Sequence, residues 1–111
     1  MAQTTIAGSF ITENTIGAAK AWAVVAANGT LESPSFNMTS VSRSATGRYV
    51  YTFDTDFSDA DYTGSPGFRT GYGSAALQEG TQAEGSVALR FWDACGTLID
   101  VNHSCVFHGE Q

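Results

Sequence analysis

The chain has 111 residues, 11 acidic and 5 basic, with a formal net charge of −6 and a hydrophobic share of 42%. This length suits one domain with one core, and the apolar content excludes a globally disordered chain. The acidic balance leaves no basic face for binding nucleic acid or an anionic membrane surface. No apolar run approaches the roughly 20 residues that insert across a bilayer, and the first residues lack the pattern of a signal peptide.

The N-terminal segment, residues 1–17, is polar and rich in threonine. Its apolar residues are few: Ile6, Phe10, Ile11 and Ile16. We expect an extended N-terminal arm that serves attachment or inter-subunit contact. Residues 18–111 are expected to form a single β domain.

Residues typical of β-strands dominate the rest of the chain, and Gly, Asn, Asp and Ser interrupt them at short intervals. Alternation is clearest at Arg48 to Phe53, where Tyr49, Tyr51 and Phe53 share one side. Further strands are predicted at 18–27, 36–41, 87–92 and 103–108. About five or six strands at this spacing predict an all-β fold, a small antiparallel β-sandwich or barrel-like domain.

Two segments are expected to be loops. Residues 42–47 form a polar loop of hairpin type between two strands. Residues 63–85 are rich in Gly, Ser, Gln and Glu, and a loop of that length in a small domain is usually functional or mobile. Within it, Phe68, Arg69 and Tyr72 are the candidate binding residues.

The acidic run from Asp54 to Asp61 is a weak candidate for a calcium site, because Asp54, Asp56, Asp59 and Asp61 offer hard oxygen ligands. The run lacks the glycine and the closing glutamate of an EF-hand loop. The alternative, which we favour, is a solvated turn in which aspartates cap nearby N–H groups. No metal or other cofactor is therefore expected.

Cys95, His103, Cys105 and His108 are residue types that zinc prefers. However, His103 and Cys105 share one strand face and His108 lies on the other, so four ligands from one chain would not converge. A metal shared on a three-fold axis stays open. Two thiols are expected at Cys95 and Cys105, and a disulfide would need a hairpin that brings them together.

Catalysis is not expected. Serines are plentiful, and His103 or His108 could act as a base, but the G-x-S-x-G elbow of a hydrolase is missing. A glycosidase needs two opposed carboxylates in a cleft, and so small a domain has little wall to build one.

Several blocks of the chain resemble a β module found near the C-termini of tailed-phage tail fibres. They are Ala19-Lys20-Ala21-Trp22, Asn28-Gly29, Ser35-Phe36-Asn37, Thr46-Gly47-Arg48-Tyr49 and Asp59-Ala60-Asp61-Tyr62. The stretch 87–109 is similar to the closing hairpin of that module. The chain differs from the family pattern in its longer, glycine-rich central loop and in its two cysteines.

The resemblance implies an all-β module that belongs to a symmetric, trimeric virion appendage. We therefore expect a non-enzymatic phage virion structural protein, a fibre tip or a head or tail fibre component that mediates host-surface adhesion. Such a protein is made in the cytoplasm of the host bacterium and is located in the virion. Its partners would be copies of itself, other virion proteins and a host surface glycan or protein.

Two other function classes stay open. The first is a capsid or tail decoration protein that clamps neighbouring subunits, with its N-terminal arm as the attachment. The second is an enzyme such as a small depolymerase or lysin fragment. Oligomerisation is expected in either structural case, because so small a sheet pair should leave Trp22, Phe36 and Tyr49 partly uncovered.

Overall fold

The strands form largely where apolar and polar side chains alternate along the chain, as the two-residue period of a half-buried strand requires. The computed structural model describes residues 18–78 and 80–111. In these ranges the strands are β1 (Ala21–Val25), β2 (Leu31–Phe36), β3 (Met38–Ala45), β4 (Arg48–Phe53), β5 (Thr63–Phe68), β6 (Ser74–Leu77), β7 (Ser86–Trp92) and β8 (His103–His108). The strands predicted at 48–53 and 103–108 are confirmed at these bounds.

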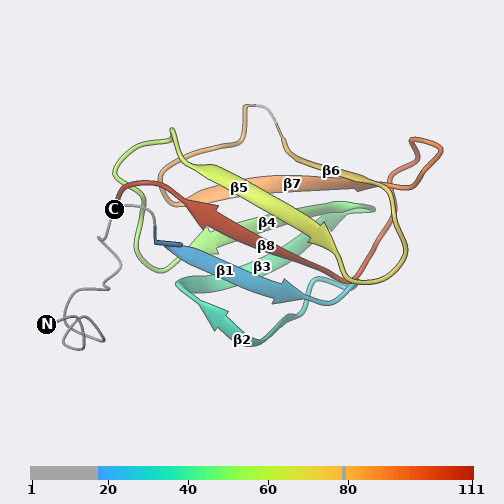
Figure 1. Ribbon diagram of the computed structural model, residues 1–111, viewed down its shortest axis with the longest axis horizontal. Helices are drawn as coiled ribbons and strands as arrows, with labels where there is room; N and C mark the ends of the chain where they lie inside the picture. The colour runs from blue at the N-terminus through green and yellow to red at the C-terminus, as the bar shows by residue number, and fades with distance from the viewer. Residues whose placement is uncertain (1–17, 79) are drawn as a thin grey trace, which may run out of the picture.

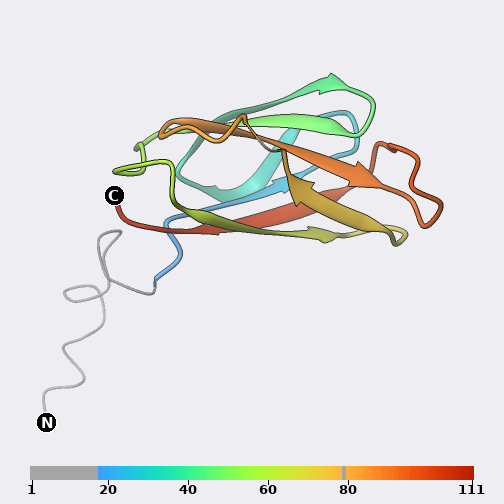
Figure 2. The same cartoon turned by 90° about the horizontal axis from the view of Figure 1, so that it is seen from above.

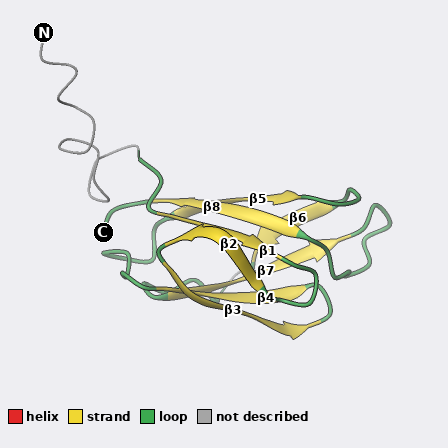
Figure 3. Cartoon of the chain, turned by 90° about the horizontal axis from the view of Figure 1, so that it is seen from below, coloured by secondary structure: helices red, strands yellow, loops and turns green. Residues whose placement is uncertain are grey.

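Two antiparallel sheets of four strands each pack face to face (Figure 1). Sheet I has the strand order β2-β1-β8-β5, and sheet II has the order β3-β4-β7-β6. Figure 2 shows the two layers from their edge, and in Figure 3 the described chain consists of strands and loops only. The predicted all-β antiparallel sandwich is confirmed, whereas the N-terminal arm, residues 1–17, lies outside the described residues.

The core lies between the sheets and is mainly aromatic. Tyr49, Tyr51 and Phe53 of β4 are buried, as their alternation predicts. The rings of Tyr51 and Phe53 meet Phe107 of β8 from the opposite sheet, at centroid distances of 5.6 Å and 5.1 Å. Edge-to-face ring pairs of this kind add to the free energy gained by burial alone. The alternation of aromatic residues in β4 therefore determines which face of sheet II packs against sheet I.

The chain passes from sheet I to sheet II at Asn37. The sequence predicts one continuous strand over residues 36–41, and this prediction is wrong. Asn37 has a φ of 58°, so Phe36 ends β2 and Met38 begins β3 in the other sheet. The Asn37 Nδ2 amide donates 3.1 Å hydrogen bonds to the carbonyls of Lys20 and Thr55. Asparagine tolerates this left-handed backbone better than other residues with a side chain, so the crossover occurs at this position.

The two predicted loops are shorter than expected. β3 continues to Ala45, and the hairpin turn consists of Thr46 and Gly47 instead of residues 42–47. The segment 63–85 contains β5 and β6, which pair with β8 and β7. All four misread strands, β2, β3, β5 and β6, lie at sheet edges. An edge strand pairs through its backbone on one side only, so it needs less apolar alternation and accommodates a proline such as Pro66.

The expectation of partly covered aromatic residues holds for two of the three. Trp22 is 38% exposed and Phe36 is half-buried, and their rings stack at 4.8 Å on the outer face of sheet I. Tyr49 is instead fully buried. Its hydroxyl donates a 2.6 Å hydrogen bond to the Ala27 carbonyl and accepts one of 3.2 Å from the Val101 amide. The Tyr49 hydroxyl can therefore be buried without leaving a hydrogen-bonding group unpaired.

Candidate functional site

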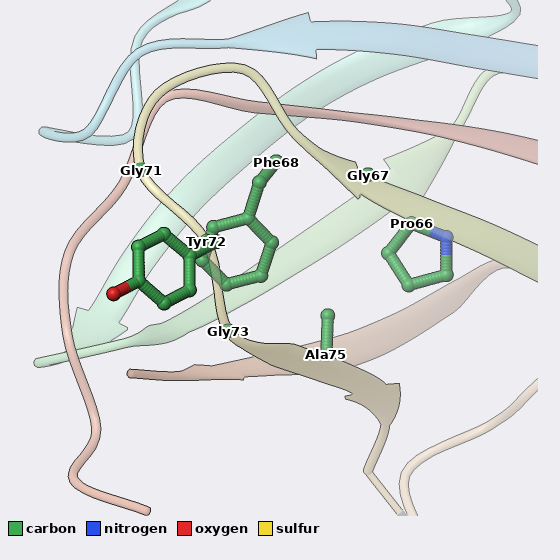
Figure 4. Close-up of a pocket in the computed structure, with 7 residues that line it drawn as sticks. All are labelled: Pro66, Gly67, Phe68, Gly71, Tyr72, Gly73 and Ala75. Carbon is green, nitrogen blue, oxygen red and sulfur yellow. The ribbon is translucent and has the colours of Figure 1, made fainter. Parts of the chain in front are cut away.

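The connection between β5 and β6 forms an open hollow at the edge of the sandwich. The hollow has a volume of about 390 Å³, and it is lined by Pro66, Gly67, Phe68, Gly71, Tyr72, Gly73 and Ala75 (Figure 4). Pro66 and Phe68 come from β5 of sheet I, and Ala75 comes from β6 of sheet II. The hollow thus lies where the two sheets meet through a short glycine-rich loop.

Glycines give this loop its shape. Gly71 has a φ of +70°, and a Cβ atom there would meet nothing within 4 Å. Gly73 instead lies against β7, where a Cβ atom would come within 1.9 Å of the Trp92 carbonyl oxygen. Only glycine fits such a close backbone approach. Gly73 therefore fixes the loop to sheet II, while the tip around Gly71 stands free.

The three predicted binding residues occupy different environments. Tyr72 is 78% exposed at the hollow, which makes it the most exposed large hydrophobic side chain of the described part of the chain. Phe68 is half-buried, and its ring lies edge-on to core residue Phe91 at 5.6 Å. Arg69 is exposed, and its backbone N–H donates a 2.8 Å hydrogen bond to the Asn102 carbonyl. Phe68 thus forms the floor of the hollow, and Tyr72 supplies the accessible ring.

The lining of the hollow is mainly apolar. Its lining has one polar side-chain group, the Tyr72 hydroxyl, and otherwise consists of apolar side chains and glycine backbone. A catalytic site needs a nucleophile, an acid or a base placed against the reacting atom. The residues that line this hollow offer an aromatic ring for stacking and backbone groups for hydrogen bonding.

The acidic run does not converge on one point. Asp54 accepts a hydrogen bond from the Thr39 hydroxyl, and Asp59 accepts one of 2.8 Å from the Asp61 backbone N–H. Asp56 is exposed beside them. Within residues 18–78 and 80–111, no three His, Cys, Asp or Glu side chains come close enough together to hold a metal ion. The contacts of Asp54 and Asp59 are those of a capped turn.

The cysteines and histidines are likewise dispersed. Cys95 is exposed in the turn after β7, whereas Cys105 is buried in β8, and both are free thiols. Burial raises the pKa of the Cys105 thiol to about 12. His103 is buried in the core, and burial lowers its pKa, while His108 on the same strand is exposed. The disulfide that the sequence left open does not form.

Sequence reasoning missed the part of the hollow that comes from other strands. Pro66 and Ala75 line it, yet neither carries a signal in the sequence, because only the pairing of β5 with β8 and of β6 with β7 brings them together. The sequence also did not show that Arg48 and Arg90 face each other, as they do across β4 and β7.

Comparison with known proteins adds no relative: no protein-family model, no curated protein and no solved structure matches the chain. In the part of the chain that the structure describes, no helix has the length and hydropathy of a membrane span.

Proposed function

We propose that the chain is a non-enzymatic structural protein of a phage virion, a fibre tip or a head or tail fibre component that mediates adhesion to the host surface. The observation that carries this proposal is the exposed Tyr72 ring over a hollow of about 390 Å³ at one edge of the sandwich. The residue blocks shared with the phage tail-fibre module give the virion context. The antiparallel sandwich is the kind of fold that this resemblance implies.

Tyr72 suits adhesion for a physical reason. A tyrosine ring offers a large apolar face and one polar group, and it has few rotatable bonds to immobilise on binding. Phe68 and Pro66 extend the apolar surface beneath it. A sugar ring or a protein side chain could stack on Tyr72 and form hydrogen bonds with glycine backbone at the rim. The ligand in this proposal is a host surface glycan or protein.

Assembly into a homotrimer with other virion proteins completes the proposal. The stacked pair of Trp22 and Phe36 on the outer face of sheet I supports it, since Trp22 remains 38% exposed. A second copy or a neighbouring virion protein would remove this surface from water, which is favourable for apolar area. In this proposal the mature location is the virion, after synthesis in the host bacterial cytoplasm.

The same aromatic pair favours one competing function, a capsid or tail decoration protein that clamps neighbouring subunits. In that case Trp22 and Phe36 would be the main contact, and Tyr72 would have no role. The adhesive function therefore predicts that substitution of Tyr72 abolishes the activity, whereas the decoration function predicts this for substitution of Trp22 or Phe36.

The test is adsorption of the purified, fluorescently labelled protein to a panel of bacterial strains and to an array of bacterial surface glycans. Tyr72→Ala should lose binding, whereas Thr70→Ala, an exposed change in the same loop, should keep it. Both variants should retain the thermal midpoint of the wild type, because Tyr72 is mostly exposed.

Parallel mass spectrometry of purified virions should detect the chain. Binding that survives in Tyr72→Ala, together with a loss of capsid stability in phage that lack the protein, would instead establish the decoration function. Absence of the chain from virions would refute both.

A further inference from the structure

Two arginines face each other on the outer surface of sheet II. Arg48 of β4 pairs directly with Arg90 of β7 in the antiparallel register. Both point away from the core, because their strand neighbours Tyr49, Leu89 and Phe91 are buried. Directly opposed residues in such a pair have Cβ atoms roughly 4.5–5.5 Å apart, and like charges at that distance disfavour the pairing. The chain thus places two of its five basic residues side by side.

Among the residues that the structure describes, neither arginine has a carboxylate partner. The ion pair present in the described ranges joins Arg43 of β3 to Asp100. Arg48 instead donates hydrogen bonds of 3.2 Å and 2.9 Å, from Nε and Nη2, to the neutral Gln78 Oε1. These bonds fix the plane of the Arg48 guanidinium, but the neutral Gln78 amide does not balance its charge.

Arg90 has no hydrogen bond or ion pair with any residue that the structure describes, and its Nε is buried without a partner. An unsatisfied buried donor costs free energy, so a native protein normally has a reason to keep one. The two terminal nitrogens of this half-buried side chain are not among the buried atoms without a partner, so they are the groups that a ligand would meet.

The neighbours of Arg90 on the outer face of sheet II are a small residue and an aromatic one. The residue opposite Arg90 on its other side is Ala76 of β6, whose side chain is a single methyl group. Trp92 lies two residues along β7 on the same face as Arg90, and it is half-buried. A pair of guanidinium groups beside an indole ring offers charge-assisted hydrogen bonds for an oxyanion and a flat apolar face for the group that carries it.

We propose that Arg48, Arg90 and Trp92 form a second binding site, which takes one carboxylate of an acidic sugar residue. Guanidinium groups recognise carboxylates through paired N–H donors, and a bound anion would also relieve the repulsion between the two arginines. The net charge of −6 repels a polyanion, so the ligand is a saccharide with isolated carboxylates. The choice of a saccharide rests on the proposed adhesive function.

The test is an NMR titration of the arginine Nε–Hε signals with an oligosaccharide that contains one glucuronic acid. The neutral glucose analogue and sodium acetate are the comparison ligands. The Arg48 and Arg90 signals should shift with the acidic oligosaccharide and not with the neutral one. Arg90→Gln should weaken binding by about tenfold or more, and Arg90→Lys should restore it only in part, because lysine lacks the planar fork.

Ser33→Asp is the matched control. It lowers the net charge by one unit, as Arg90→Gln does, but at an exposed position in β2 of the other sheet. It should change the affinity less than twofold at physiological salt, where distant charges are screened.

Three results would overturn the proposal. They are wild-type arginine signals that do not move, acetate binding as tight as that of the oligosaccharide, and equal weakening by Ser33→Asp and Arg90→Gln. The wild-type titration stands even if a variant fails to fold. Because Tyr72→Ala should leave these shifts intact, failure of the carboxylate site is distinguishable from failure of adhesion through Tyr72.

Discussion

Arg43 and Asp100 lie 57 residues apart in the sequence, yet the Arg43 Nε donates to both carboxylate oxygens of Asp100 at 2.9 Å. The same carboxylate accepts a 2.9 Å hydrogen bond from the Gly47 backbone N–H. Asp100 therefore joins the segment between β7 and β8 to the hairpin turn between β3 and β4. The hydrogen bond from Arg43 is the main reason that the pKa of Asp100 lies below its ordinary value, and the Gly47 bond adds to it.

Asp100→Asn should lower the thermal midpoint at neutral pH, because it removes the charge that Arg43 and Gly47 face. A carboxyl group with a depressed folded-state pKa stabilises above its unfolded value of about 4 and loses that contribution as the pH falls below it. The wild type should therefore lose its advantage over Asp100→Asn below about pH 4. Thermal melts at pH 7 and pH 3 check this, and an equal difference at both would contradict it.

His103 should make folding sensitive to mild acid. It is fully buried, its Nδ1 lies 2.8 Å from the Val101 carbonyl, and its Nε2 has no partner. Tyr49, Tyr51 and Phe91 pack around the ring, so the neutral form is favoured and the pKa is lowered. The unfolded chain therefore binds a proton near pH 6.5 that the folded chain does not.

The free energy of unfolding should not depend on His103 above about pH 6.5. Below that pH it should fall, by at most about 1.4 kcal/mol per pH unit. Urea unfolding at pH 7.5, 6.0 and 5.0 measures this slope. His103→Phe should flatten it, because phenylalanine does not titrate. His108→Gln, at an exposed position of the same strand, should leave it unchanged. A slope that persists in His103→Phe would assign the effect to another group.

Asn37 should be the most sensitive position of the crossover between the sheets. Asn37→Ala removes the side-chain hydrogen bonds to Lys20 and Thr55 and places a Cβ-bearing residue without that compensation at a φ of 58°. We expect a loss of about 2–4 kcal/mol in the free energy of unfolding. Asn37→Gly, which accepts the backbone but not the hydrogen bonds, should cost about 1 kcal/mol less. Equal losses would mean that backbone conformation has no part in the effect.

Gly47 and Gly71 form a matched pair. Their φ angles are +69° and +70°, but a Cβ atom at Gly47 would lie 2.8 Å from the Phe91 carbonyl oxygen, whereas one at Gly71 would meet nothing within 4 Å. Gly71→Ala should therefore lower the free energy of unfolding by about 1 kcal/mol, from backbone strain alone. Gly47→Ala should cost about 3 kcal/mol, because backbone atoms must also move. Denaturant unfolding of both variants measures the difference, and similar costs would exclude the clash.

The two thiols should differ sharply in reactivity. Cys95 is exposed, whereas Cys105 is buried and its pKa is raised to about 12. Since the thiolate is the reactive form, a disulfide reagent such as DTNB should titrate one thiol per native chain and two in guanidinium chloride. Cys95→Ser should remove the native reaction, and Cys105→Ser should leave it. Two fast thiols in the native protein would show that β8 opens readily.

The strands of the core could be predicted from the sequence alone. In β4 the alternation of Tyr49, Tyr51 and Phe53 with Arg48, Val50 and Thr52 defines both the strand and its buried face. The same holds for β8, where His103, Cys105 and Phe107 turn inward. A strand that buries one face must alternate, so its sequence contains the information. Tyr72 could also be named as a binding candidate from the sequence, because it is an aromatic residue within a glycine-rich segment.

Only the tertiary structure decided how the edges and the sites are built. β5 and β6 pair through backbone groups at sheet edges, so Thr63, Gly64 and Ser65 carry no alternation that a sequence could reveal. The hollow needs Phe68 from one sheet and Ala75 from the other, and the paired Arg48 and Arg90 are 42 positions apart, at register positions set by β4 and β7. Local patterning follows from whether a side chain is buried, whereas the meeting of distant residues follows from strand register. Register is a property of two strands together, so neither segment encodes it alone.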